Sequence, residues 1–206
     1  MDQLAELAIG QRDSILFGLY ETTFGPEVAG LATCPNCGEH LETNFNVADV
    51  RVEANDTNGV LFLNCEGYEV RIRLPNSFDL ISISGIKDLE AGKDALLKRC
   101  LIEIRDGSGE VSFDQIPSEI EEAIAESMED ADPQGNVKVN LSCPSCECQW
   151  QVVFDILSFI WDEINAWSQR TLRDVHVLAK AYGWSERDIL EMTSYRRQIY
   201  LEMTGS

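Results

Sequence analysis

The sequence predicts an α+β fold in which strands and a helix are inserted between the two halves of a four-cysteine site, followed by a C-terminal helical region. Three observations support this prediction. Two Cys-Pro-x-Cys motifs lie far apart, short apolar segments typical of strands lie between them, and apolar residues recur at helical spacing near both ends. With 206 residues, 44% of them hydrophobic, the chain can bury a sizeable core.

Residues 1–33 are predicted to form an N-terminal helical segment. Over residues 4–20 apolar side chains recur every three or four positions, and only Gly10 interrupts the pattern. We therefore expect either a pair of short helices or one kinked helix. The helical structure should end at the Phe-Gly-Pro sequence of residues 24–26, because proline cannot continue a helix. A loop rich in glycine and alanine should then lead to residue 34.

Residues 34–153 are predicted to form a β-rich domain with a long insertion. Within residues 68–74 polar and apolar side chains alternate, so one face of that strand should contact solvent. A helix is expected from Pro117 to about Met128, where acidic residues in the first turn suit the positive end of the helix dipole. The segments predicted to be strands are residues 60–63, 68–74, 80–83 and 137–141.

Residues 154–206 are predicted to be helical. Apolar side chains recur at spacings of three and four over residues 154–182, which indicates one long amphipathic helix. Two shorter helices should follow, and we expect the three regions of the chain to pack into one compact unit. The residues expected to end or cap these helices are Gly183, Ser185 with Asp188, and either Thr193 or Ser194.

The strongest chemical signal is the pair of motifs Cys34-Pro35-Asn36-Cys37 and Cys143-Pro144-Ser145-Cys146. In a motif of this kind, a zinc knuckle, a tight turn directs two thiolates at one metal ion. Two knuckles supply the tetrahedral four-thiolate site that zinc favours, and such a site has no open coordination position. We therefore predict a split zinc ribbon with one structural zinc ion (Zn2+), bound by Cys34, Cys37, Cys143 and Cys146.

The 105 residues between Cys37 and Cys143 are an unusual separation, because the halves of a ribbon usually lie about 15–20 residues apart. Lengthening the loop about sevenfold adds about 1.7 kcal/mol of closure entropy. Zinc binding supplies about 10–16 kcal/mol in small peptides. The long insertion is therefore compatible with a shared metal, especially if the insertion folds by itself.

Other ligands and another metal remain alternatives. Glu147 stands where the first knuckle has Gly38, and the neighbouring Cys148 is a possible alternative ligand to Cys146. His40 could also bind the metal, although a solvent-exposed histidine is the commoner case. Iron could occupy the same four sulfurs. The remaining cysteines, which we expect to be small buried apolar residues, are Cys65 and Cys100.

A thiol–disulfide oxidoreductase is the alternative function, since a Cys-Pro-x-Cys pair such as Cys34 and Cys37 also occurs in that class of enzyme. There, however, the pair follows a strand and begins a helix, whereas Cys34 is expected to follow a loop and precede an extended segment. We find no phosphate-binding glycine loop, no metalloprotease motif and no hydrolase nucleophile motif. We therefore predict no catalytic residues and a protein that is not an enzyme.

The charge is strongly acidic, with 36 Asp and Glu against 16 Lys and Arg, a net −20. Residues 1–150 carry −18 and residues 151–206 only −2. Such a surface repels phosphate backbones and anionic lipids, so nucleic acid is a poor partner and a basic protein is a better one. A zinc-ribbon nucleic-acid adaptor is therefore the least favoured function. We find neither a membrane-spanning apolar run nor a signal peptide, so we expect no membrane insertion and a cytoplasmic protein at synthesis.

The C-terminal third combines aromatic residues with arginines, which is the composition of protein-interface anchors. The same residues could equally form the core of a helical hairpin. The candidates for partner binding are Trp184, Tyr195, Arg196, Arg197 and Tyr200.

Several of these segments resemble a family found in contractile phage tails and contractile injection systems. The family is similar to the T-even-type baseplate hub and hub-assembly chaperone proteins. The resemblance implies a non-enzymatic factor that assembles, or stays in, the baseplate hub of a phage tail-like particle, with hub or spike proteins as partners. The segments that carry it are Ile9-Gly10-Gln11-Arg12-Asp13, Phe24-Gly25, Cys34 to Glu39, Leu41-Glu42, Arg73-Leu74-Pro75, Asp79-Leu80, Arg99-Cys100-Leu101, Cys143 to Cys146, Phe154-Asp155, Val175-His176, Leu178-Ala179, Tyr182 to Ser185, Arg196-Arg197 and Tyr200-Leu201.

Overall fold

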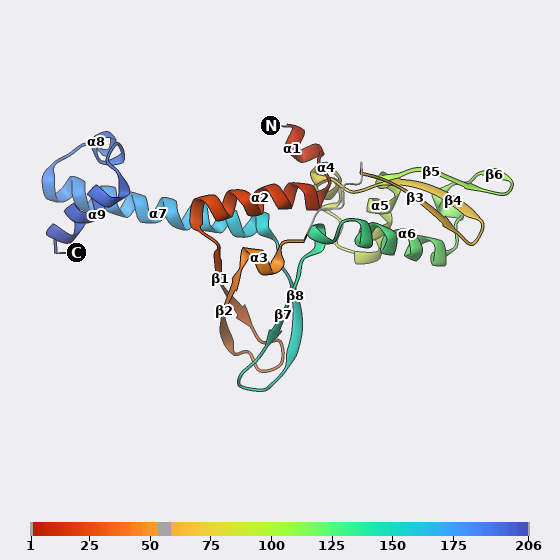
Figure 1. Ribbon diagram of the computed structural model, residues 1–206, viewed down its shortest axis with the longest axis horizontal. Coiled ribbons are helices and arrows are strands. Elements are labelled where there is room, and N and C mark those ends of the chain that lie inside the picture. Colours follow the sequence, from red (N-terminus) through yellow and green to blue (C-terminus); the bar gives the residue numbers. More distant parts are fainter. Residues whose placement is uncertain (1, 53–58, 206) are drawn as a thin grey trace. The chain divides into compact units, whose positions relative to one another are not determined.

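The computed structural model describes residues 2–52 and 59–205, and the chain divides into two compact units, Met1–Ile156 and Leu157–Ser206. The mixture of helices and small antiparallel sheets confirms the α+β class (Figure 1). The helices of unit 1 are α1 (Asp2–Glu6), α2 (Ile9–Phe24), α3 (Val47–Val50), α4 (Ser77–Ile83), α5 (Leu89–Cys100) and α6 (Ser118–Ala131), with 3-10 turns η1 (Phe113–Gln115) and η2 (Pro133–Asn136). Its strands are β1 (Glu27–Thr33), β2 (His40–Asn46), β3 (Val60–Cys65), β4 (Tyr68–Arg73), β5 (Leu101–Asp106), β6 (Gly109–Glu110), β7 (Lys138–Ser142) and β8 (Gln149–Val153).

The N-terminal segment forms a pair of helices rather than one kinked helix. The break lies at residues 7–8, where Ala8 bridges Asn76 and the N–H of Ile9 donates to the carbonyl of Pro75 at 3.1 Å. Gly10 therefore belongs to the first turn of α2. The second helix ends at Phe24 as expected, and Gly25 follows it with φ 99°.

The inserted body of unit 1 is a four-stranded antiparallel sheet in the order β3-β4-β5-β6. The predicted strands at residues 60–63 and 68–74 are confirmed as β3 and β4. Along β4, Val70 and Ile72 are buried while Glu69 and Arg71 are exposed, so one face is covered. The covering side chains come from α5 and α6, and the buried core includes Leu97, Cys100, Ile104, Ile120, Ile124 and Met128.

The prediction of a strand at residues 80–83 is wrong, because these residues lie in helix α4. The prediction rested on β-branched residues, but a capping box just upstream starts a helix. The side chain of Asn76 accepts a hydrogen bond from the N–H of Asp79, and the Asp79 carboxylate accepts one from the N–H of Asn76. The residues before Cys34 also differ from the prediction, since they form strand β1 instead of a loop.

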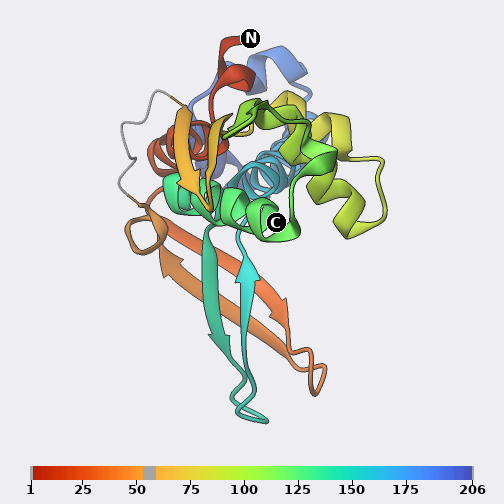
Figure 2. The same cartoon turned by 90° about the vertical axis from the view of Figure 1, so that its right-hand side faces the viewer.

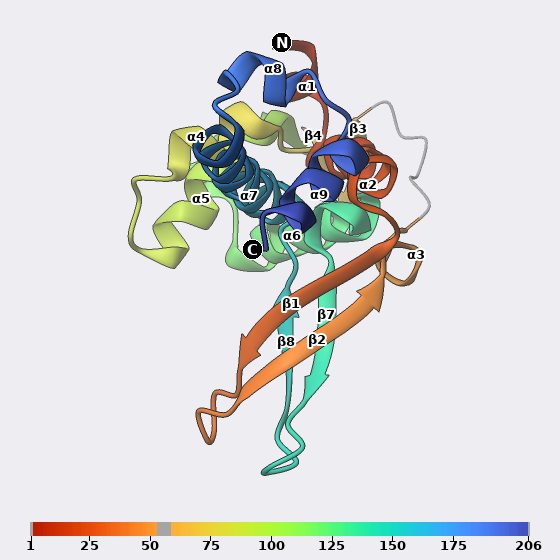
Figure 3. The ribbon, with the colours of Figure 1, turned by 90° about the vertical axis from the view of Figure 1, so that its left-hand side faces the viewer.

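Two long hairpins, β1–β2 and β7–β8, lie side by side and extend from the rest of unit 1 (Figures 2 and 3). Strand β7 confirms the prediction at residues 137–141. At the base, Phe154 lies 6.0 Å from Phe17 of α2 and 5.2 Å from Phe45 of β2, measured between ring centroids. Buried Gln134 accepts a hydrogen bond from the N–H of Val52 at 2.6 Å. These contacts join two hairpins that are distant in the sequence.

Unit 2 is helical, with most of α7 (Ile156–Tyr182), then α8 (Glu186–Leu190) and α9 (Ser194–Met203). The predicted caps are confirmed. Gly183 has φ 69°, Ser185 forms a capping box with Asp188, and Thr193 caps α9. Within residues 2–52 and 59–205, none of the helices has both the length and the apolar character needed to cross a bilayer.

Candidate metal centre

Each Cys-Pro-x-Cys motif forms the turn at the tip of a hairpin, and the two turns have the same hydrogen bonds. In the first, the N–H of Gly38 donates to the carbonyl of Cys34 at 3.0 Å, and the N–H of Cys34 donates to the carbonyl of Glu39 at 2.8 Å. In the second, the corresponding bonds are Glu147 to Cys143 and Cys143 to Cys148, both at 2.9 Å. The two turns are therefore structurally equivalent residue by residue.

The tips of the two hairpins bring four sulfur atoms together. The Sγ atoms of Cys34 and Cys146 are 3.6 Å apart, as are those of Cys37 and Cys143, and all four lie within 4.8 Å of one another. A tetrahedron of zinc–sulfur bonds of about 2.3 Å places its sulfurs about 3.8 Å apart. The arrangement therefore has the size that a four-thiolate metal site requires.

The equivalence of the two turns also shows which residues of the first knuckle correspond to Glu147 and Cys148. Glu147 has φ 57°, close to the φ 77° of Gly38, so it adopts the left-handed backbone that glycine supplies in the first knuckle. Cys148 corresponds to Glu39, whose role is to close the turn through its backbone carbonyl. The Sγ of Cys148 lies outside the group of four sulfurs.

The surroundings of the sulfurs favour the thiolate forms of Cys146 and Cys34 and oppose the thiolate form of Cys37. Hydrogen bonds from the Asn36 side chain and the N–H of Cys148 lower the pKa of Cys146 to about 6. Burial alone would raise the pKa of Cys34, but the backbone N–H groups of Cys37 and Asn36 bring it below its usual value. Although the N–H of Glu39 lowers the pKa of Cys37, the neighbouring thiols raise it to about 12. Four thiolates this close need a compensating cation to be ionised together.

The other histidine and cysteine candidates lie elsewhere. His40 is exposed, and its Nδ1 lies 3.1 Å from the hydroxyl of Thr33. Cys100 is fully buried in the core of the inserted body, as expected, and burial raises its pKa to about 11. Cys65 is only partly buried at the edge of that core.

The residues predicted for partner binding, Trp184, Tyr195, Arg196, Arg197 and Tyr200, have different surroundings in unit 2. Trp184 stacks on Tyr182 with ring centroids 4.5 Å apart, and Tyr200 lies edge-on to Trp184 at 4.8 Å. Arg197 is buried, whereas Tyr195 and Arg196 are exposed. Trp184, Arg197 and Tyr200 therefore contribute to the packing of the unit, whereas Tyr195 and Arg196 are accessible.

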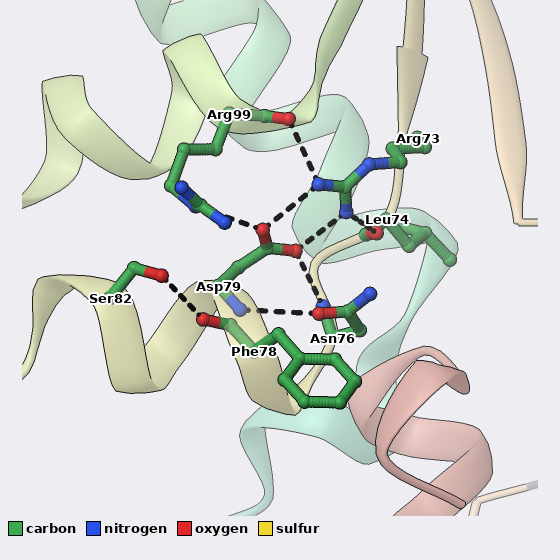
Figure 4. A network of polar contacts seen from close by, with 7 residues as sticks. All are labelled: Arg73, Leu74, Asn76, Phe78, Asp79, Ser82 and Arg99. Atoms are coloured by element: carbon green, nitrogen blue, oxygen red, sulfur yellow. Dashed lines mark hydrogen bonds and ion pairs between the residues drawn. The ribbon is translucent and has the colours of Figure 1, made fainter. Parts of the chain in front are cut away.

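A buried charge cluster is the feature to which sequence reasoning gave no role (Figure 4). The Asp79 carboxylate, 1% exposed, accepts hydrogen bonds from Arg73 at 2.6 and 2.9 Å and from Nε of Arg99 at 3.0 Å. Arg73 also donates to the carbonyls of Leu74 and Arg99. Burial opposes ionisation, but the hydrogen bonds from Arg73 and the N–H of Asn76 hold the pKa of Asp79 below its usual value.

This cluster ties together three chain segments, the end of β4, the start of α4 and the end of α5. Three segments of the family resemblance contribute to it, namely Arg73-Leu74-Pro75, Asp79-Leu80 and Arg99-Cys100-Leu101. The one signal in the sequence is the spacing of Asn76 and Asp79, which is typical of a capping box. The pairing with two arginines depends on the tertiary fold.

Comparison with known proteins identifies the family. A family model described as T4 bacteriophage base plate protein matches residues 1–161. No curated protein and no solved structure matches the chain. The matched segment contains both knuckles, the inserted body and the Asp79 cluster. Because the match extends over more than half of the chain, the protein belongs to the family of the T4 bacteriophage base plate protein.

Proposed function

We propose that this protein is a non-enzymatic, zinc-stabilised assembly factor or structural component of the baseplate hub of a contractile phage tail-like particle. The observation that carries the proposal is the convergence of four sulfurs from two equivalent knuckles in a chain of the base plate family. The family itself supports a structural or assembly role in a phage baseplate. The assignment to the baseplate hub and the stabilisation by zinc are our proposal.

The zinc would be bound by Cys34, Cys37, Cys143 and Cys146 and would fasten the two hairpin tips together. A single two-stranded hairpin is marginally stable in water, and β1–β2 and β7–β8 each form a separate two-stranded sheet. The aromatic contacts described above hold the two hairpins at the base. A metal at the tips would hold them at the other end, so the pair would present one rigid projection to a neighbouring protein.

Two observations support a structural role for these cysteines over a thiol–disulfide oxidoreductase. The Cys34–Cys37 pair lies in a turn between two strands, whereas a low-pKa redox cysteine commonly lies at a helix N-terminus. A site with four thiolates also leaves no position where a substrate or water could bind the metal. Both points support a structural metal site over an active site.

The expected partners are hub or spike proteins with basic surfaces. Residues 1–156 carry a net charge of −19, which attracts a basic surface and repels a like one. The exposed Tyr195 and Arg196 are further candidates for contacts, since tyrosine and arginine are common interface anchors. Such contacts would incorporate the protein, at least transiently, into the particle.

Native mass spectrometry of the protein recovered gently from its own host tests the proposal. We expect one zinc per chain and a co-purifying baseplate or spike protein. The matched variants are Cys146→Ser, which should lose the zinc, and Cys148→Ser, which should keep it. A metal-free chain with a Cys34–Cys37 disulfide and without a tail protein would contradict the proposal and favour the oxidoreductase.

A further inference from the structure

Helix α7 has an exposed apolar face between residues 157 and 172. Its large apolar side chains include Trp161, which is 70% exposed, and Leu172, which is 58% exposed. Contiguous exposed apolar surface on a folded protein commonly marks an interaction site. The other exposed large apolar residues between positions 157 and 172 are Leu157, Ile164 and Trp167.

The spacing of this face is that of a coiled coil. We define the α7 seam as the residues separated by alternating steps of four and three, namely Leu157, Trp161, Ile164, Ser168, Thr171 and Val175. A repeat of 3.5 residues keeps such a seam facing a second helix along its length. Trp167 and Leu172 flank the seam, so the exposed large apolar residues between positions 157 and 172 lie on it or beside it.

From this face we infer that the α7 seam pairs antiparallel with the same seam of a second copy of the chain. The sizes of the side chains fit this pairing. With the helices centred near residue 166, Trp161 of one copy lies opposite Thr171 of the other, and Ile164 lies opposite Ser168. A large residue then meets a small one at each of these positions, which is how facing positions of a coiled coil interdigitate.

The charges along α7 select the antiparallel direction. The N-terminal half of the helix carries Asp162 and Glu163, whereas the C-terminal half carries Arg170, Arg173 and Lys180 against one acidic residue, Asp174. An antiparallel pair brings the acidic half of each helix to the level of the basic half of the other, at two symmetric places. A parallel pair would place like charges beside each other, which is unfavourable.

The distribution of charge over the chain explains why a second copy fits here. Residues 157–206 carry a net −1, whereas residues 1–156 carry −19, so unit 2 is the part of the chain that can approach its own copy with little repulsion. Each unit 1 is joined to the N-terminal end of its own α7. Antiparallel helices join their acidic units at opposite ends, where the repulsion between them is weakest.

Sedimentation velocity of the full zinc-loaded chain over a wide concentration range tests this inference. We expect the mass of two chains, and we expect Trp161→Glu with Ile164→Glu to give the mass of one. Gln169→Ala, a change on α7 away from the seam that leaves the charges of the helix unaltered, is the control that should leave the dimer intact. Circular dichroism confirms that each variant keeps its helices. A wild-type chain that stays single throughout, or a dimer that survives the double seam variant, would overturn the inference.

A charge exchange tests the direction of the pair. Glu163→Arg alone and Arg170→Glu alone should each weaken dimerisation about threefold, because each places like charges at the same level of the two helices at two symmetric places. The two substitutions combined should restore it. Failure of the combination to restore dimerisation would contradict the antiparallel arrangement. None of these outcomes depends on whether the protein acts in the baseplate hub.

Discussion

Gly38 and Glu147 occupy the same place in the two knuckles and have the same left-handed backbone, with φ 77° and 57°. Glycine adopts this conformation without a steric penalty, whereas an L-residue with a Cβ is disfavoured by about 1–2 kcal/mol. The side chain of Glu147 is exposed and forms no hydrogen bond with the residues that the structure describes. The second knuckle therefore carries a local strain that the first does not.

Replacing Glu147 by glycine should relieve this strain. We expect Glu147→Gly to raise the free energy of unfolding of the zinc-loaded protein by about 1 kcal/mol, measured by chemical denaturation. Gly38→Ala is the matched control and should lower it by a similar amount. A loss of stability in Glu147→Gly would show that the glutamate side chain makes a stabilising contact.

Gly10 shows what residue-level reasoning can and cannot predict. Its presence in an apolar repeat correctly indicated a break in the helix nearby. The structural reason is a contact with a residue 122 positions away, since the N–H of Gly10 donates to the Asp132 carboxylate at 2.8 Å and a Cβ at Gly10 would overlap that carboxylate. A partner this distant has no local signal in the sequence.

At the scale of single elements, local signals predicted the structure well where the cause was local. The caps at Ser185 and Thr193 are fixed by side chain to backbone bonds within a few residues, and Gly183 ends α7 with φ 69° and a backbone bond to the carbonyl of Ala179. The strand prediction for residues 80–83 was wrong because it rested on their β-branched side chains alone, whereas the capping box of Asn76 and Asp79 starts helix α4. Strand β1 was missed because Gly30 and the alanines beside it have low β-propensity, which pairing with β2 overrides.

The Asp79 cluster fixes α4 against α5 and β4, so Asp79→Asn should destabilise the inserted body. We expect a loss of about 3 kcal/mol at neutral pH, because the substitution removes the charge from a buried, paired carboxylate. The measurement is chemical denaturation of both proteins. A loss below about 0.5 kcal/mol would show that the arginines stabilise the fold without this charge.

The same comparison predicts a pH dependence. The folded pKa of Asp79 lies below its unfolded value of about 4, so its contribution is present above pH about 4 and is lost as the pH falls through the folded pKa. The stability difference between the wild type and Asp79→Asn should therefore shrink in acid. A difference that stays constant down to pH about 2 would contradict this assignment.

At the scale of the whole molecule, the convergence of two distant motifs was predictable because metal ligands are constrained to meet. The inserted body between them has its own core, with residues such as Ile72, Ile104 and Ile124 fully buried. This explains physically how a long insertion is tolerated, because its ends are held by a folded body rather than by a flexible loop. The packing of Phe154 against Phe17 and Phe45 joins distant segments and has no comparable signal in the sequence.

Removal of zinc by a chelator should therefore act on one part of unit 1. We expect faster hydrogen exchange in the β1–β2 and β7–β8 hairpins, while the sheet β3–β6 keeps its protection through its own core. Hydrogen exchange with mass spectrometry measures both in one experiment. Unchanged exchange in the hairpins would mean that the metal does not hold their tips together.

The most direct test of the account is X-ray absorption at the zinc edge on protein purified from its own host. We expect one zinc per chain with four sulfur ligands at about 2.3 Å and no nitrogen or oxygen ligand. A different metal, a mixed ligand set with an open position, or a chain whose cysteines are oxidised in place of metal-bound would contradict it.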